Sequence, residues 1–229
     1  MIDIPLSVLS LIETRVLGVL VEKQHTVPDI YPLTLNALVS GCNQKSSRDP
    51  MMNASLAEVR SAIDNLIRQA LVTETSSGRA DKFSHNMERI LKIPSQSVAL
   101  IATLMLRGPQ TAGELRINSE RLHKFADISS VESFLEELAE RREGSLVVKL
   151  PRQPGSRENR WMHLLSGMPE IHHDLPAERG EMHRSTESTV TESDFIELKS
   201  QVIRLETELV SLRQMIDVLS TQINPPAKQ

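Results

Sequence analysis

The stretch ASLAEVRSAIDNLIRQALVTETSSGRADKFSH, residues 54–85, decides how the first half of this chain folds. Its apolar residues recur at steps of three and four, which predicts a helix with one buried face. Ser55 is expected to cap this helix, and Glu58 stands three residues on as a capping-box partner. After the helix, LVTETSS reaches Gly78, and KFSHNMERILKI returns with enough alternation for a β-hairpin. The expected buried stripe of the helix consists of Leu56, Val59, Ile63, Leu66 and Ile67.

Two further helices are expected before this stretch. Residues 8–23, VLSLIETRVLGVLVEK, place their apolar side chains from Val8 onward on one helical face. The segment HTVPDIYP interrupts that helix, since its two prolines cannot donate backbone hydrogen bonds. Thr34 or a neighbour can cap the short helix LTLNALVSGCN that follows. The order helix, helix, helix, hairpin is that of a winged helix, whose third helix usually enters the DNA major groove.

The same order of elements returns in the second half. SQSVALIATLMLRG predicts a helix that ends at Gly108, AGELRI a short helix, and residues 129–142 a third. LVVKL and RWMHLL then read as the strands of a second hairpin. The sequence therefore predicts a mainly α fold with small β-hairpins, an α+β class, built as two tandem winged-helix domains at 1–94 and 95–166.

The C-terminal part has a different pattern. Residues 167–192 are rich in Pro, Gly, Ser and Thr without apolar periodicity, which is typical of a flexible linker. Residues 193–223 follow a heptad repeat with Leu at every d position, which favours a parallel two-stranded coiled coil and hence a homodimer. A second apolar row beginning at Ile196 leaves open that this helix packs on its own domains or forms a higher oligomer. The dimerisation residues predicted by the repeat are Leu198, Val202, Leu205, Leu209, Leu212, Ile216 and Leu219.

The net charge of the chain does not by itself favour DNA binding. The net charge is −4, and residues 1–94 carry as many acidic as basic side chains, so any DNA contact must rest on local patches. The loop from Asn43 to Arg48 suits phosphate contacts, and with equal weight it suits capping and orienting the third helix. The candidate DNA-binding residues are Gln44, Lys45, Arg48, Arg60, Asn65, Arg79, Lys82, Arg152, Arg157 and Arg160.

The third helix of the second domain, residues 129–142, has an acidic outer face, which argues against inserting it into a groove. Its hairpin is basic instead, and it can lie along phosphates or pair with an acidic protein surface. Two functions therefore stay open. One is a dimeric DNA-binding or transcription-regulating factor, and the other is a protein–protein scaffold like those of chromosome-organising complexes, with a partner at the acidic helix.

An enzyme is the weakest alternative. Cys42 has no identifiable base beside it, and a lone cysteine at a helix end is usually a small packed side chain. Neither a phosphate-binding glycine loop nor a nucleophile elbow appears, and no cofactor is expected. The histidines at 172, 173 and 183 lack the spacing of a zinc site, so no metal is predicted. Without a secretory signal or a bilayer-length apolar run, the expected location is the cytoplasm, away from membranes.

Residues 15–50, RVLGVLVEKQHTVPDIYPLTLNALVSGCNQKSSRDP, resemble a family of uncharacterised bacterial proteins, the YceH-like family. The resemblance continues through GRADKFSH, GELRINSERLHKF and LVVKLPRQPGSRENRWMHLL, and covers roughly residues 10–166. It implies a tandem winged-helix fold. It implies no activity, catalytic residue or cofactor, because the function of that family is itself unknown.

Overall fold

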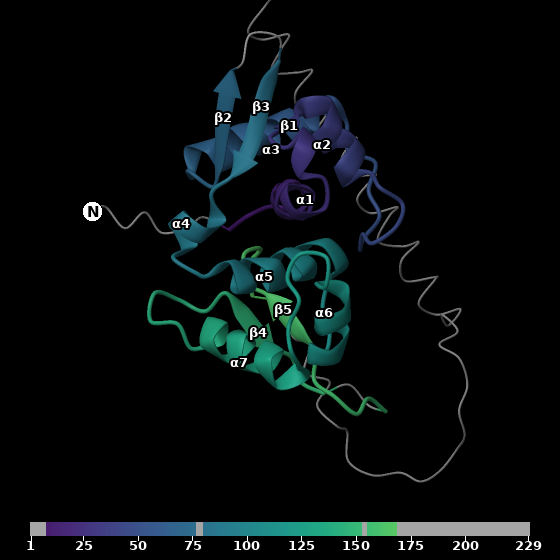
Figure 1. The fold of residues 1–229 in the computed structure, drawn as a ribbon, viewed down its shortest axis with the longest axis vertical. Coiled ribbons are helices and arrows are strands. Elements are labelled where there is room, and N and C mark those ends of the chain that lie inside the picture. The colour runs from purple at the N-terminus through teal and green to yellow at the C-terminus, as the bar shows by residue number, and fades with distance from the viewer. Residues whose placement is uncertain (1–7, 77–79, 153–154, 169–229) are drawn as a thin grey trace, which may run out of the picture. The chain divides into compact units, whose positions relative to one another are not determined.

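The computed structural model describes residues 8–76, 80–152 and 155–168, and these lie within one compact unit (Figure 1). Over these residues the fold is mixed α/β, with seven α-helices and two small antiparallel sheets. None of the described helices is long and apolar enough to span a bilayer. The predicted coiled-coil helix 193–223, all of its dimerisation residues and most of the linker 167–192 lie outside the described residues.

The first half follows the predicted order of three helices and a hairpin, with a short extra strand before the second helix. That strand, β1, pairs with β3, and β3 pairs with β2, so the sheet order is β1-β3-β2. Phe83 at the middle of β3 is buried and lies opposite Leu33 on one side and Glu74 on the other. The elements are α1 (Leu11–Thr26), η1 (Pro28–Ile30), β1 (Leu33–Thr34), α2 (Leu35–Cys42), α3 (Leu56–Arg68), β2 (Val72–Ser76) and β3 (Asp81–His85).

The second half repeats this arrangement with shorter strands. Its hairpin strands pair with Val147 opposite His163 and Lys149 opposite Trp161. Gln110, just before the second helix of this half, forms an isolated antiparallel bridge to Trp161. Gln110 therefore takes the position that β1 has in the first half. The elements are α5 (Ser95–Arg107), α6 (Ala112–Asn118), α7 (Ile128–Ala139), β4 (Val147–Lys149) and β5 (Trp161–His163).

The helix starts follow from their caps. The predicted capping box of α3 is present, since Ser55 Oγ accepts from the Glu58 backbone and Glu58 accepts from the Ser55 backbone. Ser10 caps α1 in the same way, so that helix begins at Leu11, three residues later than the apolar pattern suggests. Val8 accordingly lies outside the helix and is 70% exposed. Leu11 and Leu56, the first residues of α1 and α3, are each 52% exposed. The expected burial of these three side chains is wrong.

The second strand of the first hairpin, β3, is shorter than expected. Only Asp81–His85 is a strand, and the next residues form a five-residue helix, α4 (Met87–Leu91). Met87 and Leu91 are buried four residues apart, which is a helical spacing and not strand alternation. Interpreting NMERILKI as part of the strand was therefore wrong.

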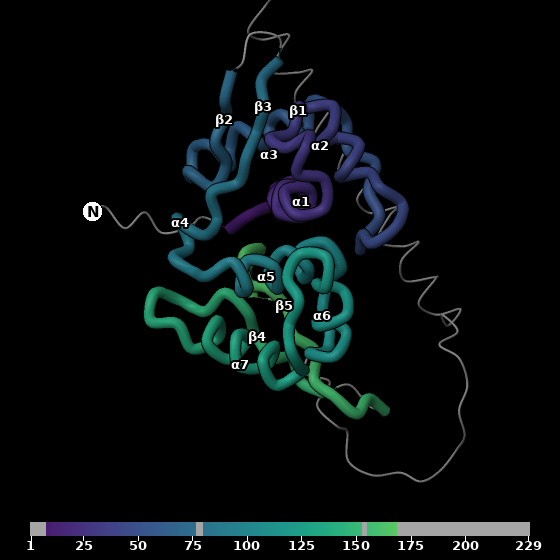
Figure 2. The backbone as a smooth tube through the Cα atoms, viewed as in Figure 1, coloured from purple at the N-terminus to yellow at the C-terminus, as the bar shows by residue number. Residues whose placement is uncertain are grey.

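The two halves meet along their first helices, α1 and α5, which lie side by side (Figure 2). Gly18 permits this contact, because a Cβ built there would lie 2.9 Å from Leu106 Cγ. Helix α1 also contacts α2 and α3 on its other sides, so apolar residues outside its predicted face, such as Leu17 and Val21, are fully buried as well. The first helix is a shared core element of both halves.

Candidate nucleic-acid interface

Helix α3 presents the first group of candidate residues. Arg60 lies on its outer side, with Nε 3.0 Å from Asp64 Oδ1 and Nη1 3.0 Å from Glu74 Oε1. Its guanidinium also stands over the Phe83 ring, 5.5 Å from the centroid. The hydrogen bond to Glu74, with the nearby carboxylates, raises the pKa of Arg60. Arg60 is thus fully charged, but its charge is already balanced by Asp64 and Glu74. Asp64 is four residues away on the same helix, whereas Glu74 lies on β2.

Asn65, one turn further, is the other candidate on this helix. Arg68 donates a hydrogen bond to Asn65 Oδ1. Reading adenine with an asparagine requires that oxygen as an acceptor together with the amide nitrogen as a donor. In this arrangement Asn65 contributes to an exposed polar end of α3, where Arg68 already occupies one of the two acceptor positions of Oδ1.

The loop after α2 carries three more candidates, and Arg48 is not where a phosphate could reach it. Its side chain is buried and donates to both carboxylate oxygens of Glu22 on α1, at 3.1 and 2.6 Å, and to the Gly41 carbonyl at 3.1 Å. Burial opposes ionisation of Glu22, yet the hydrogen bonds and charge of Arg48 lower the pKa of its carboxyl. The prediction of a phosphate contact by Arg48 is corrected accordingly: this side chain holds the loop to α1.

Other contacts of the same loop also have an orienting role. Asn43 forms two hydrogen bonds with the Ala54 backbone, at 2.7 and 2.8 Å, immediately before the Ser55 cap of α3. Arg15 on α1, also buried, donates to the carbonyls of Cys42 and Pro50. Of the two roles predicted for this loop, these contacts favour capping and orienting α3.

Gln44 and Lys45 stand at the outer side of the loop. Gln44 Oε1 accepts from Lys23 at 3.3 Å, and its amide donates to the Ser46 carbonyl at 3.0 Å. The Lys45 side chain is exposed. Lys45 is therefore the residue of this loop best placed to contact a phosphate.

The hairpins hold the remaining candidates. Lys82 is half-buried on β3 opposite Thr34 and Thr75, and Arg79 lies outside the described residues. In the second hairpin, Arg152 and Arg157 are exposed and form no ion pair with any described residue. The β2–β3 hairpin and the loop after β4 extend toward opposite ends of the unit (Figure 1).

Arg160 differs from the other two arginines of the second hairpin. Its Nη1 donates to the Pro109 carbonyl at 2.7 Å, and its Nη2 lies 3.2 Å from Glu114 Oε1. These contacts tie β5 to the start of α6. Arg160 is consequently a half-exposed anchor of the hairpin, whereas Arg152 and Arg157 project from its loop.

Helix α7 has the acidic outer face that the sequence predicts. Its buried side holds Val131, Leu135 and Leu138. A duplex phosphate would be repelled along the opposite side, since four carboxylates of this segment are exposed. These are Glu132, Glu136, Glu137 and Glu140.

A catalytic role for Cys42 has no support in its surroundings. The side chain is fully buried, and burial raises the pKa of its thiol to about 11. No described group of three or more His, Cys, Asp or Glu side chains is arranged to hold a metal ion.

Comparison with known proteins places the chain in a family. A family model described as a protein of unknown function, DUF480, matches residues 9–156. The chain belongs to the DUF480 family. A UPF0502 protein of Dechloromonas aromatica (strain RCB) is 57% identical over 208 residues, which cover 91% of this chain and 94% of that protein. A UPF0502 protein of Burkholderia pseudomallei (strain 668) is 55% identical over 212 residues, covering 93% and 88%. The predicted membership of an uncharacterised bacterial family is confirmed.

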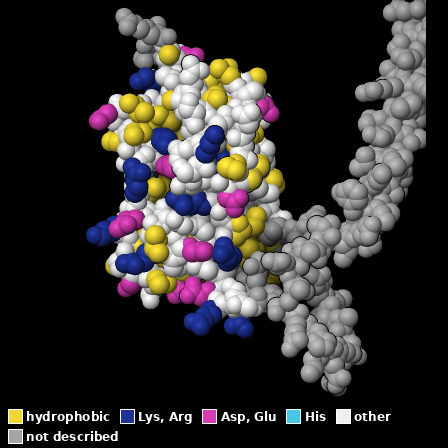
Figure 3. Space-filling model, turned by 90° about the vertical axis from the view of Figure 1, so that its right-hand side faces the viewer, with side chains coloured by type: hydrophobic (Ala, Val, Ile, Leu, Met, Phe, Trp, Pro, Cys, Tyr) yellow, Lys and Arg dark blue, Asp and Glu magenta, His cyan; other side chains and the backbone are white. Residues whose placement is uncertain are grey.

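The DUF480 match spans α1 to β4 and stops inside the second hairpin loop. It includes Arg152 and ends just before Arg157. Within this region, the surface charges are mixed on the face drawn in Figure 3, where Lys and Arg side chains are interspersed with Asp and Glu. On this face, the Lys and Arg side chains of the DUF480 region therefore form small groups and not one large basic surface.

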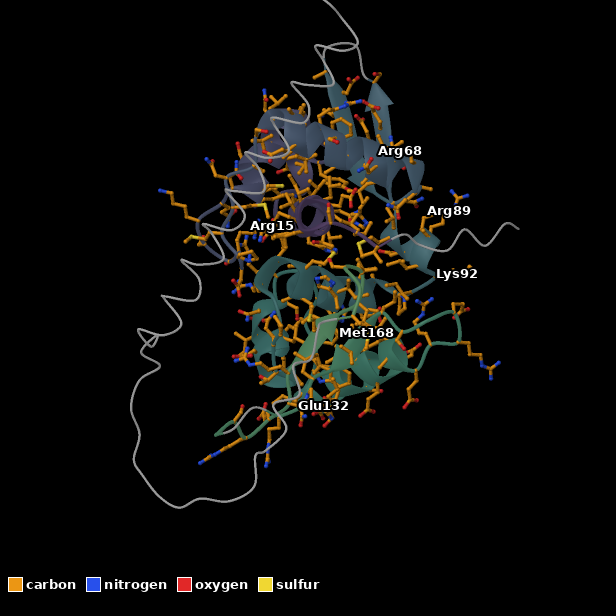
Figure 4. All side chains as sticks on the ribbon, turned by 180° about the vertical axis from the view of Figure 1, so that it is seen from behind. Arg15, Arg68, Arg89, Lys92, Glu132 and Met168 are labelled. Carbon is orange, nitrogen blue, oxygen red and sulfur yellow. The ribbon has the colours of Figure 1, made fainter. Side chains whose placement is uncertain are left out.

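One such group in the DUF480 region was missed from the sequence. Arg68, Arg89 and Lys92 lie along one side of the molecule, at the ends of α3 and α4 (Figure 4). Asn86 donates to the Ala70 carbonyl at 3.2 Å and Arg141 to the Leu91 carbonyl at 2.7 Å, so α4 links the segments that follow α3 and α7. The signal was the helical spacing of NMERILKI. Cations at helix C-termini also stabilise the helix dipole, which accounts for them without a ligand.

Proposed function

We propose that each half of the chain is a winged-helix domain. The sheet order β1-β3-β2, with a strand before the second helix and a hairpin after the third, supports this assignment for the first half. The bridge between Gln110 and Trp161 supports it for the second, because it reproduces the outer strand in shortened form. Under this assignment α3 and α7 are the third helices, and the two hairpins are the wings.

We further propose that the protein is a non-enzymatic, cytoplasmic, dimeric DNA-binding factor. The observation that carries this proposal is the exposed pair Arg152 and Arg157 on the second wing, which has no acidic partner among the described residues. Lys45 and Lys82 supply further cations, and dimerisation is assigned to the heptad residues of 193–223. Two such chains would double the number of phosphate contacts.

The mode of binding is contact with the phosphate backbone and not insertion of a helix. Arg60 is balanced by Asp64 and Glu74, and the outer face of α7 is acidic, so neither third helix gains electrostatically from entering the groove. Phosphate contacts give an affinity that depends strongly on salt and weakly on sequence.

The direct test combines Arg152→Glu with Arg157→Glu in the full chain and measures duplex binding by fluorescence anisotropy over a salt series. We expect weaker binding to every duplex, and a log–log salt slope reduced by about one for each contact removed. Arg89→Glu with Lys92→Glu is the matched control, since it makes the same charge change at α4 and the residue that follows it, on the other side of the second half from this loop (Figure 1). Equal loss in both variants, or no loss in either, would reject the wing as the binding site.

A second candidate function is a protein–protein scaffold. It is favoured by one observation, the exposed row of four glutamates on α7, which suits a basic protein partner better than a nucleic acid. Retention of one stoichiometric partner after nuclease treatment supports this function, and its loss on nuclease treatment supports the DNA-binding one.

A further inference from the structure

A groove of about 420 Å³ runs between α7 and the second hairpin. Glu136, Ala139 and Glu140 form one side of it, and the residues of β4 with Trp161 and Leu164 form the other. Met168, labelled in Figure 4, also lines the groove and is 68% exposed. We propose that this groove binds an extended segment of a partner protein, in which apolar residues alternate with Lys or Arg. This segment would belong to the protein partner expected at the acidic helix, residues 129–142, and its binding is separate from DNA binding.

The hydrogen-bond register of the hairpin leaves backbone groups on the outer side of β4. Leu150 donates to Arg160 and Leu164 donates to Leu146, each at 2.8 Å. In an antiparallel pair hydrogen-bonded and non-hydrogen-bonded positions alternate, so the backbone groups of Val147 and Lys149 point away from β5.

The opposite strand supports this register. Trp161 forms a non-hydrogen-bonded pair with Lys149, and its own N–H and C=O bond outward to Gln110, at 2.7 and 3.0 Å. Among residues 8–76, 80–152 and 155–168, no strand pairs with the corresponding groups of Val147 and Lys149, because β4 is at the edge of the two-stranded sheet. An added strand would pair with both residues.

The groove has apolar residues at its base and carboxylates beside them. Val147 and Trp161 are buried at its floor, and Lys149 Nζ lies 5.4 Å from the centroid of the Trp161 ring. A bound apolar side chain could therefore rest on the indole once the flexible lysine moves aside. The rim is acidic because Glu136 and Glu140 are both exposed there.

The outward backbone groups of β4, the apolar base and the acidic rim together favour one kind of ligand. A duplex would be repelled by the two rim glutamates. A helix would leave the outward backbone groups of Val147 and Lys149 without partners, whereas an extended segment pairs with them. Basic side chains flanking the apolar ones complement the rim, so the occupant is an extended, basic and apolar peptide segment.

The chain carries its own reporter, since Trp161 is its one tryptophan and lines the groove. The full-length protein is used to select from a random-peptide library, and the enriched peptide is synthesised as the probe. We expect it to alternate apolar and basic residues, to change the Trp161 fluorescence, and to slow hydrogen exchange of the Val147 and Lys149 amides.

Matched variants on α7 locate the site. Glu136→Lys with Glu140→Lys should raise the Kd of this peptide about tenfold, through loss of two charge pairs and added repulsion. Glu132→Lys with Glu137→Lys makes the same charge change on the same exposed helix outside the groove and should leave the Kd nearly unchanged. Equal effects of both pairs, peptides without the alternation, or unprotected Val147 and Lys149 amides would overturn the proposal. Competition with the peptide by a duplex or by a second copy of the chain would also overturn it. The Arg152 and Arg157 variants test DNA binding separately.

Discussion

The ion pair between Arg48 and Glu22 gives the sharpest stability prediction. The Arg48 side chain is fully buried and that of Glu22 only 15% exposed. Arg48→Ala therefore leaves a nearly buried carboxylate whose remaining cationic partner among the described residues is Lys23, with Nζ 3.1 Å from Glu22 Oε2. Breaking such a pair costs about 3 kcal/mol or more, because the remaining carboxylate is desolvated and loses both hydrogen bonds from its buried partner. The Gly41 and Ser47 carbonyls lose a donor as well. We therefore expect the free energy of unfolding to fall by about 3–5 kcal/mol in urea denaturation followed by circular dichroism.

The control is the double variant Arg48→Met with Glu22→Gln, which removes both charges and keeps much of the volume. It should recover most of the lost stability, since replacing a whole buried pair is often close to neutral. Duplex binding by the folded fraction of Arg48→Ala should match that of the natural protein. A loss of less than about 1 kcal/mol, together with weakened duplex binding, would contradict the structural role of Arg48 and restore it as a phosphate ligand.

Three further predictions concern helix packing, pH and the tail. Gly18→Ala should destabilise the protein by about 1–3 kcal/mol in urea denaturation, because its Cβ would press on Leu106, whereas Gly113→Ala has room and should be neutral or slightly stabilising. Burial lowers the pKa of His163 to about 4, so the unfolded chain takes up its proton first as the pH falls. The stability that the neutral His163 side chain contributes above pH 6.5 should therefore be lost progressively toward pH 4, by up to about 3 kcal/mol. In denaturation at several pH values, His163→Phe should remove this part of the pH dependence and leave the part due to His85, whose pKa burial also lowers to about 4. An unchanged pH dependence in that variant would assign the effect to other groups. Leu205→Glu with Leu212→Glu should convert a dimer into a monomer in analytical ultracentrifugation, and a persistent dimer would move self-association away from the heptad residues.

The features predicted well from the sequence are local ones. The box of Ser55 and Glu58 was found because both partners lie within one helical turn. The acidic outer face of α7 was found for the same reason, since helical periodicity alone assigns its exposed positions. The order of helices and hairpins in both halves could likewise be predicted from such short-range patterns.

The features missed depend on residues far apart in sequence. Arg48 looked like a free loop cation because Glu22 precedes it by 26 residues, and only packing of the loop against α1 brings them together. Arg60 looked available because Glu74 reaches it from β2. Gly18 carried no signal at all, since its role depends on α5. Several candidate DNA contacts were therefore reduced to structural roles by long-range pairing.

The proposed function requires that the protein bind duplex DNA through its phosphates. The decisive measurement is the affinity of the full-length natural protein for several unrelated duplexes over a range of salt concentrations. A dimer with two to four phosphate contacts in each chain should bind all of them at low salt, with a log–log slope of about −4 to −7. Absence of binding at the lowest salt, or binding indifferent to salt, would contradict the proposed function and leave the protein-binding function as the remaining candidate.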